Sequence, residues 1–121
     1  MAFMIYQTAD GHIPAWEYYK ADGLTPKAGM ALKLSGGKLV PATSGKPEYI
    51  SMREQINAVA EGDALIPVVH VDSSVVFEVT TSASLVVGAT AAVASDSLSV
   101  GAGEGGVVIE VPEDGVVRVR F

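Results

Sequence analysis

The chain has 121 residues, which is enough to bury one hydrophobic core but too few for two independent domains. Hydrophobic residues make up 49% of it, yet no apolar run reaches the roughly 18 to 20 residues of a membrane-spanning helix, and the absence of cysteine excludes disulfides and thiolate sites. The formal net charge of −6 leaves no basic surface to neutralise phosphate groups. We therefore expect a single domain whose partners include neither nucleic acid nor a membrane.

The N-terminal segment, residues 1–23, carries five of the eight aromatic side chains. Turn-forming residues interrupt it at Asp10-Gly11 and end it at Asp22-Gly23, which predicts an extended arm, 1–23, ahead of a β domain, 24–121. Two uses of the aromatic residues remain open. They pack on the domain of their own subunit, or they contact another subunit or protein, since Tyr and Trp are favoured at interfaces. The candidate contact residues are Tyr6, Trp16, Tyr18 and Tyr19.

Most of the remaining chain has apolar residues at every second position, which is the period of half-buried β-strands. Gly36-Gly37 separates two such runs, and PEDG at 112–115 separates two others, which predicts two β-hairpins. We therefore predict an all-β fold, a small β-barrel or β-sandwich built from hairpins. The predicted core contains Leu32, Leu34, Leu39, Val68, Phe77, Val79, Val93, Ile109, Val117 and Val119.

One segment, SMREQINAVAEGD at 51–63, has a composition and spacing that could support a short helix, so the prediction allows at most one. Residues 29–39 and 88–98 have a similar pattern: each stretch of eleven residues contains a glycine, a strand, a tight turn and a leucine, in this order. A strand, an acidic turn and a closing strand follow each of them. The two stretches indicate either two related β units or a chance similarity between hairpins.

The residue types that catalysis and metal binding require occur without a supporting pattern. GAGEGG at 101–106 has the glycine spacing of a dinucleotide-binding loop, but a predicted strand follows it where that loop needs a helix. His70 and Asp72 would project to the same side of a strand, yet a closed metal site needs three or four ligands. We therefore expect no enzymatic activity, no catalytic residues, and no bound metal or cofactor.

Three stretches of the chain together resemble a known protein family. They are AGMALKLSGGKLVPATSGKPEYISM, AEGDALIPVVHVD and VGATAAVASDSLSV. In their glycines, alternating strands and short turns they resemble the small capsid decoration, or head cement, proteins of tailed bacteriophages. The likeness covers residues 24–121 and leaves the predicted arm outside it.

The resemblance implies a structural virion protein that binds the outside of a phage capsid and stabilises it. Its partners would be the major capsid protein and further copies of itself, as a homo-oligomer and most often a trimer. It would be made in the cytoplasm of the bacterial host, and the start of the chain shows no pattern of a secretory signal. The alternative is a small-ligand or carbohydrate-binding β module of a phage tail or fibre.

Overall fold

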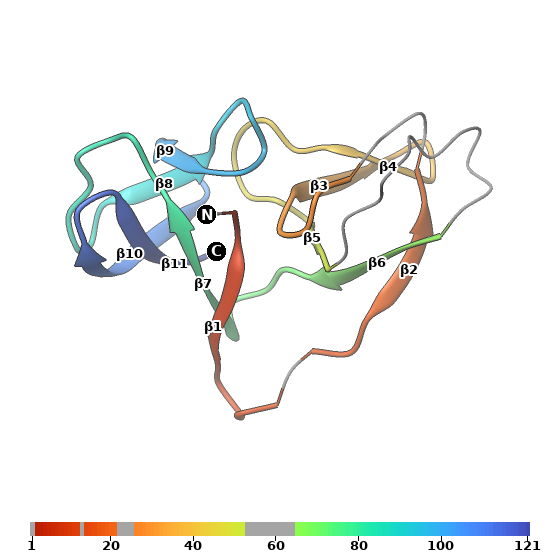
Figure 1. Cartoon of the computed structure of the whole chain (residues 1–121), viewed down its shortest axis with the longest axis horizontal. Helices are drawn as coiled ribbons and strands as arrows, with labels where there is room; N and C mark the ends of the chain where they lie inside the picture. The colour runs from red at the N-terminus through yellow and green to blue at the C-terminus, as the bar shows by residue number, and fades with distance from the viewer. Residues whose placement is uncertain (1, 13, 22–25, 53–64) are drawn as a thin grey trace.

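The computed structural model describes residues 2–12, 14–21, 26–52 and 65–121. These residues form eleven β-strands in two antiparallel sheets, and none of them is helical. The sheets form a sandwich-like arrangement rather than one closed barrel (Figure 1). The all-β prediction is therefore confirmed. The short helix considered at 51–63 lies, from residue 53 onward, outside the described residues.

The larger sheet has six strands in the order β1-β7-β11-β10-β8-β9, so β1 and β9 are its edges. Its strands are β1 (Met4–Thr8), β7 (Val75–Thr80), β8 (Thr90–Val93), β9 (Val100–Ala102), β10 (Gly106–Glu113) and β11 (Val116–Arg120). The smaller sheet has the order β2-β6-β5-β3-β4, so β2 and β4 are its edges. Its strands are β2 (Glu17–Lys20), β3 (Ala31–Ser35), β4 (Lys38–Pro41), β5 (Tyr49–Ser51) and β6 (Leu65–His70).

Both predicted hairpins are present. Ser35 pairs with Lys38 across a two-residue turn in which Gly36 and Gly37 have φ values of 60° and 81°. Positive φ at both positions matches the twist of the flanking strands and favours glycine over residues with a side chain. Asp114-Gly115 forms the second turn, between β10 and β11. Local turn chemistry therefore sets the register of both hairpins.

The chain consists of two halves with the same strand order. The first half contains β2 to β6 and the second contains β7 to β11, and in each the strands lie in the order first, fifth, fourth, second, third. A residue just after the first strand also forms a parallel bridge to the third strand, Ala21 to Leu39 in one half and Thr81 to Val100 in the other. Of the eleven strands in the described part of the chain, β1 alone lies outside this scheme. The strand order thus supports the repeat suggested by the sequence.

The backbone hydrogen bonds before the second strand of each half also correspond. A turn ends at Met30 in the first half and at Ala89 in the second, and the glycine before it donates to the neighbouring fourth strand. The three bonds in the first half are Met30 N to Lys27 O (3.1 Å), Gly29 N to Ser51 O (2.8 Å) and Ser51 N to Met30 O (2.9 Å). In the second half they are Ala89 N to Val86 O (3.0 Å), Gly88 N to Val108 O (2.8 Å) and Val108 N to Ala89 O (2.9 Å).

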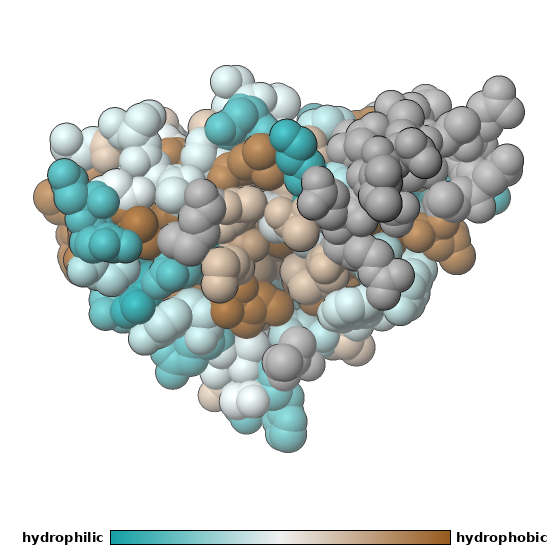
Figure 2. All heavy atoms as spheres, viewed as in Figure 1, coloured by the Kyte–Doolittle hydropathy of each residue, from teal (hydrophilic) through white to brown (hydrophobic). Residues whose placement is uncertain are grey.

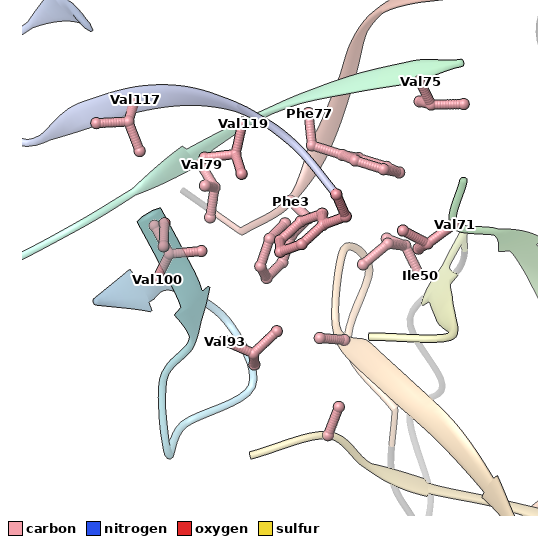
Figure 3. Packing of buried hydrophobic residues seen from close by; sticks show 14 of the residues in the cluster. Phe3, Ile50, Val71, Val75, Phe77, Val79, Val93, Val100, Val117 and Val119 are labelled. Atoms are coloured by element: carbon pink, nitrogen blue, oxygen red, sulfur yellow. The ribbon is translucent and has the colours of Figure 1, made fainter. Parts of the chain in front are cut away.

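The main hydrophobic core fills the space between the two sheets. Figure 3 shows Phe3 near its centre, with Phe77 and Val119 of the larger sheet on one side and Ile50 and Val71 on the other. A second, smaller cluster lies on the opposite face of the smaller sheet. It contains Ala21, Leu32, Leu39, Tyr49, Ile66 and Val68. The middle of the smaller sheet is therefore buried on both faces, which explains why β5 has no exposed residue.

Eight of the ten predicted core residues are buried, and Leu34 and Ile109 are only half-buried. Leu34 lies one residue from the exposed end of its strand and contacts the smaller cluster from its margin. Ile109 lies at an irregularity in the pairing of β10 with β11, where the register shifts between Val108 and Glu110. Such a bulge interrupts the alternation of side chains, so the period of two fails at this residue.

The segment predicted as an arm contributes an edge strand to each sheet. Strand β1 pairs antiparallel with β7, and β2 pairs antiparallel with β6. Phe3 is 2% exposed and its ring lies 6.2 Å from that of Phe77 and 6.1 Å from that of Phe121, measured between centroids. The described part of residues 1–23 is therefore packed into the β structure of its own chain.

Candidate interaction surface

The four candidate contact residues fall into two separate places. Tyr6 lies on β1 at the edge of the larger sheet, whereas Tyr18 and Tyr19 lie on β2 at the edge of the smaller sheet, with Trp16 just before them. Tyr6, Trp16 and Tyr18 are 46%, 43% and 55% exposed, while Tyr19 is half-buried. The structure thus leaves three of the four aromatic side chains accessible to a partner.

Tyr6 belongs to a charged network on the outer face of the larger sheet. The guanidinium carbon of Arg118 lies 3.7 Å from the centroid of the Tyr6 ring, a cation–π contact. Arg118 donates from Nε to Glu78 (3.0 Å) and from Nη1 to Glu110 (2.9 Å). Since Arg118 binds both carboxylates and the ring at once, it holds Tyr6 in place on β1.

Trp16 and Tyr18 present exposed aromatic surface at the edge of the smaller sheet. Tyr18 pairs with Pro67 and Lys20 pairs with Leu65, which places Tyr18 and Leu65 on the same face of the β2–β6 pair. Leu65 is itself 53% exposed. The β2–β6 pair therefore combines an edge of the smaller sheet with exposed aromatic and aliphatic side chains.

Tyr19 faces the other way and is already bound within its own chain. Its hydroxyl donates to Glu17 Oε1 (2.7 Å) and accepts a hydrogen bond from the Tyr49 hydroxyl (3.3 Å). The hydrogen bonds with Tyr49 and Glu17 raise the pKa of Tyr19 above its ordinary value of 10.0. Its ring also lies 5.0 Å from that of Tyr49, between centroids. Of the four candidates, Tyr19 is thus the one with a role inside the fold.

The glycine-rich stretch 101–106 has a packing role. A side chain at Gly105 would lie 2.7 Å from the backbone of Gly45, and one at Gly106 would lie 2.8 Å from the carbonyl oxygen of Arg120. The stretch leads into strand β10 rather than into a helix, so it lacks the helix N-terminus on which a dinucleotide loop depends. Gly105 therefore lets its loop approach the loop at Gly45, and Gly106 lets the start of β10 approach β11.

His70 and Asp72 are also accounted for by local contacts. Asp72 accepts hydrogen bonds from both the hydroxyl and the backbone N–H of Ser74, and these bonds lower the pKa of its carboxyl group. His70 contacts the ring of Tyr49 edge-on. Within the described residues, no group of three or more His, Cys, Asp or Glu side chains could hold a metal ion. Nor do these residues include a helix with the length and hydrophobicity to cross a membrane.

Several exposed apolar residues escaped the prediction from sequence. Met4, Val86 and Val87 are 53%, 69% and 64% exposed, and Arg118 forms its network through strands that are distant in the chain. Figure 2 shows brown and tan residues in the middle of the face in view, where Figure 1 places β1. Val86 and Val87 directly precede Gly88, and glycine is typical of the later positions of a β-turn. The sequence could therefore have indicated a turn that carries two apolar side chains. The exposure of Met4 and the contacts of Arg118 depend on strand order and leave no local signal.

Comparisons with protein-family models, with curated proteins and with solved structures found no match for this chain.

Proposed function

We propose that this protein is a non-catalytic structural component of a phage virion. It binds the outer surface of the capsid, stabilises the shell as a decoration protein, and has the major capsid protein as its partner. It is made in the cytoplasm of the bacterial host. The family resemblance of residues 24–121 motivates this assignment, and the exposed side chains on the edge strands support it.

The exposure of Trp16, just before β2, and of Tyr18, on β2, is the observation that carries the proposal. Burying an aromatic side chain is favourable, and a side chain exposed to water does not gain this free energy. Contiguous exposed apolar surface therefore marks interaction sites. Here they lie at an edge that is held by pairing with β6, so a partner meets side chains that are already positioned. This combination supports binding to a large surface, which needs no catalytic group.

Self-association is part of the proposal. A decoration protein gains when several copies bind neighbouring sites together, because linkage can raise the overall affinity about 100- to 10,000-fold above that of one contact. We therefore propose a homo-oligomer, specifically a trimer. Light scattering over a range of concentrations tests this, and a monomer at every concentration would contradict it.

The decisive experiment for the function mixes the purified protein with expanded shells of the phage that encodes it. We expect saturable co-sedimentation and added density on the outer face of the shell by cryo-electron microscopy. An unrelated acidic protein of similar size serves as the control. If the protein fails to sediment with the shells at any concentration, the proposed function is wrong.

A depression along β1 favours the alternative, a ligand- or carbohydrate-binding module. It has a volume of about 600 Å³ and is lined by Ile5, Tyr6, Gln7, Thr8, Ala9 and Gly11. This volume lies within the range of small-molecule sites, and aromatic rings such as that of Tyr6 stack against sugars. Screening the protein against an array of glycans tests this alternative. Saturable binding that Tyr6→Ala abolishes would support it, and the absence of any binding would dismiss it.

A further inference from the structure

The two halves of the protein differ at their first strands: that of the second half is covered by an additional strand, and that of the first half is not covered by any strand among the described residues. Strand β1 pairs with β7 along the edge that β7 would otherwise expose. Among the described residues, β2 has β6 as its only strand partner and ends the smaller sheet. The repeated topology of residues 2–12, 14–21, 26–52 and 65–121 thus contains two equivalent edges, one occupied and one open.

The two edges correspond residue by residue. Ala21 and Thr81 both form the parallel bridge to the third strand, so Tyr18 in β2 corresponds to Glu78 in β7. Pairing with the fifth strand is consistent with this correspondence, because Tyr18 pairs with Pro67 of β6 and Glu78 pairs with Arg118 of β11. In the second half, β1 covers residues 75–78, from Thr8 opposite Val75 to Met4 opposite Glu78. The corresponding open edge in the first half is therefore residues 15–18.

We propose that residues 15–18 form a docking edge at which an extended segment of the capsid protein adds as an antiparallel strand. This proposal rests on the proposed function for the identity of the partner. Strand addition to an open sheet edge supplies main-chain hydrogen bonds for affinity, and the alternating side chains supply specificity. Strand β1 shows, within the same molecule, how an extended segment occupies the equivalent position.

The side chains at this edge define the chemistry of the strand that fits it. Trp16 and Tyr18 lie on the exposed face, so alternate residues of the partner should be apolar or aromatic. Glu17 and Tyr19 lie on the other face, where the carboxylate of Glu17 already accepts a hydrogen bond. Residues facing Glu17 should therefore be basic or carry hydroxyl groups.

The same chemistry argues against β1 of a second copy as the occupant. Phe3, directly before β1, packs edge-on against Phe77, and the residue equivalent to Phe77 in the first half is Glu17. An anchor such as Phe3 would meet a carboxylate at that position, which is costly without a hydrogen-bonding partner. The open edge is thus suited to a segment of different sequence.

The test combines hydrogen exchange with a charged variant, using the full-length protein and expanded shells. Binding should slow the exchange of backbone amides within residues 15–18. The double variant Trp16→Lys/Tyr18→Lys should weaken shell binding by at least about tenfold, because two cross-strand contacts are lost. Val87→Lys is the matched control, since Val87 is 64% exposed and lies on a turn of the other half. It should bind shells as the wild type does.

Each other outcome counts against the proposal in a distinguishable way. If the wild type binds shells while exchange at 15–18 is unchanged, or while the double variant binds equally well, the docking edge is wrong and the proposed function stands. If the wild type does not bind shells, both fail together. If the amides of 15–18 become protected as protein concentration rises without shells, a second copy occupies the edge and the capsid protein does not.

Discussion

Gly29 and Gly88 occupy equivalent positions in the two halves of the protein, and each donates its backbone N–H over 2.8 Å to the neighbouring fourth strand. Their φ values, 76° and 91°, are both in the region that favours glycine. Their surroundings differ. A side chain at Gly29 would lie 2.5 Å from the carbonyl oxygen of Phe3, whereas nothing lies within 4 Å of one at Gly88. The turn has the same geometry in both halves, but only in the first half does the N-terminal segment pack against it.

This difference predicts unequal effects of the same substitution. Gly88→Ala should destabilise the protein by about 1 to 2 kcal/mol, the cost of placing a side chain at positive φ. Gly29→Ala should cost more, because the backbone at Phe3 must also move. Urea unfolding of the two variants measures both values. Equal losses would contradict the close packing of Phe3 against Gly29.

The burial of Phe3 predicts that the N-terminal segment contributes to stability. Phe3→Ala should cost about 3 to 5 kcal/mol, the range for removing a buried phenylalanine ring. Met4→Ala is the matched control, since Met4 is the next residue and is 53% exposed, and it should change stability by less than about 0.5 kcal/mol. Urea unfolding measures both. If the two variants were equally stable, β1 would not be anchored in the core as described.

The elements that depend on neighbouring residues could be predicted from the sequence. The turns at Gly36-Gly37 and Asp114-Gly115 are local features, and both are present, as is the alternation in the later part of β7, from Phe77 to Thr80. The pairing of β1 with β7 joins residues about 70 positions apart, and no local signal specifies it. This explains why residues 1–23 were predicted as an arm although their described part forms two edge strands.

The candidate site could be predicted only in part. Composition identified the aromatic residues, but their exposure depends on which sheet edge each one joins. Alternation along β2 separates Tyr19 from Trp16 and Tyr18, so a pattern of two could have indicated that Tyr19 faces the interior. The open edge at residues 15–18 follows from comparing the strand orders of the two halves, which the sequence alone does not provide.

Arg118 should couple more strongly to one of its carboxylate partners than to the other. The side chain of Glu78 is 21% exposed and that of Glu110 is 54% exposed, so water screens the second pair more. Double-mutant cycles with Arg118→Met and either Glu78→Gln or Glu110→Gln measure the two coupling energies. We expect a larger coupling energy for Glu78 than for Glu110. A larger value for Glu110 would contradict the ranking by exposure.

The turn around Asp96 predicts a pH-dependent contribution to stability. The backbone N–H of Leu98 donates to Asp96 Oδ1 over 2.9 Å, and this bond, with those from Ser99, lowers the pKa of the carboxyl group below its ordinary value of 3.8. A lowered pKa means that the native state favours the ionised form of Asp96. The contribution of Asp96 to stability is therefore fully present above the pKa of the unfolded state, and it is lost as the pH falls through the pKa of the folded state. The stability difference between the wild type and Asp96→Asn should therefore be constant near neutral pH and shrink below about pH 4. Thermal unfolding from pH 7 to pH 2.5 measures the difference, and a gap that persists at the acid end would show that the charge of Asp96 is not its cause.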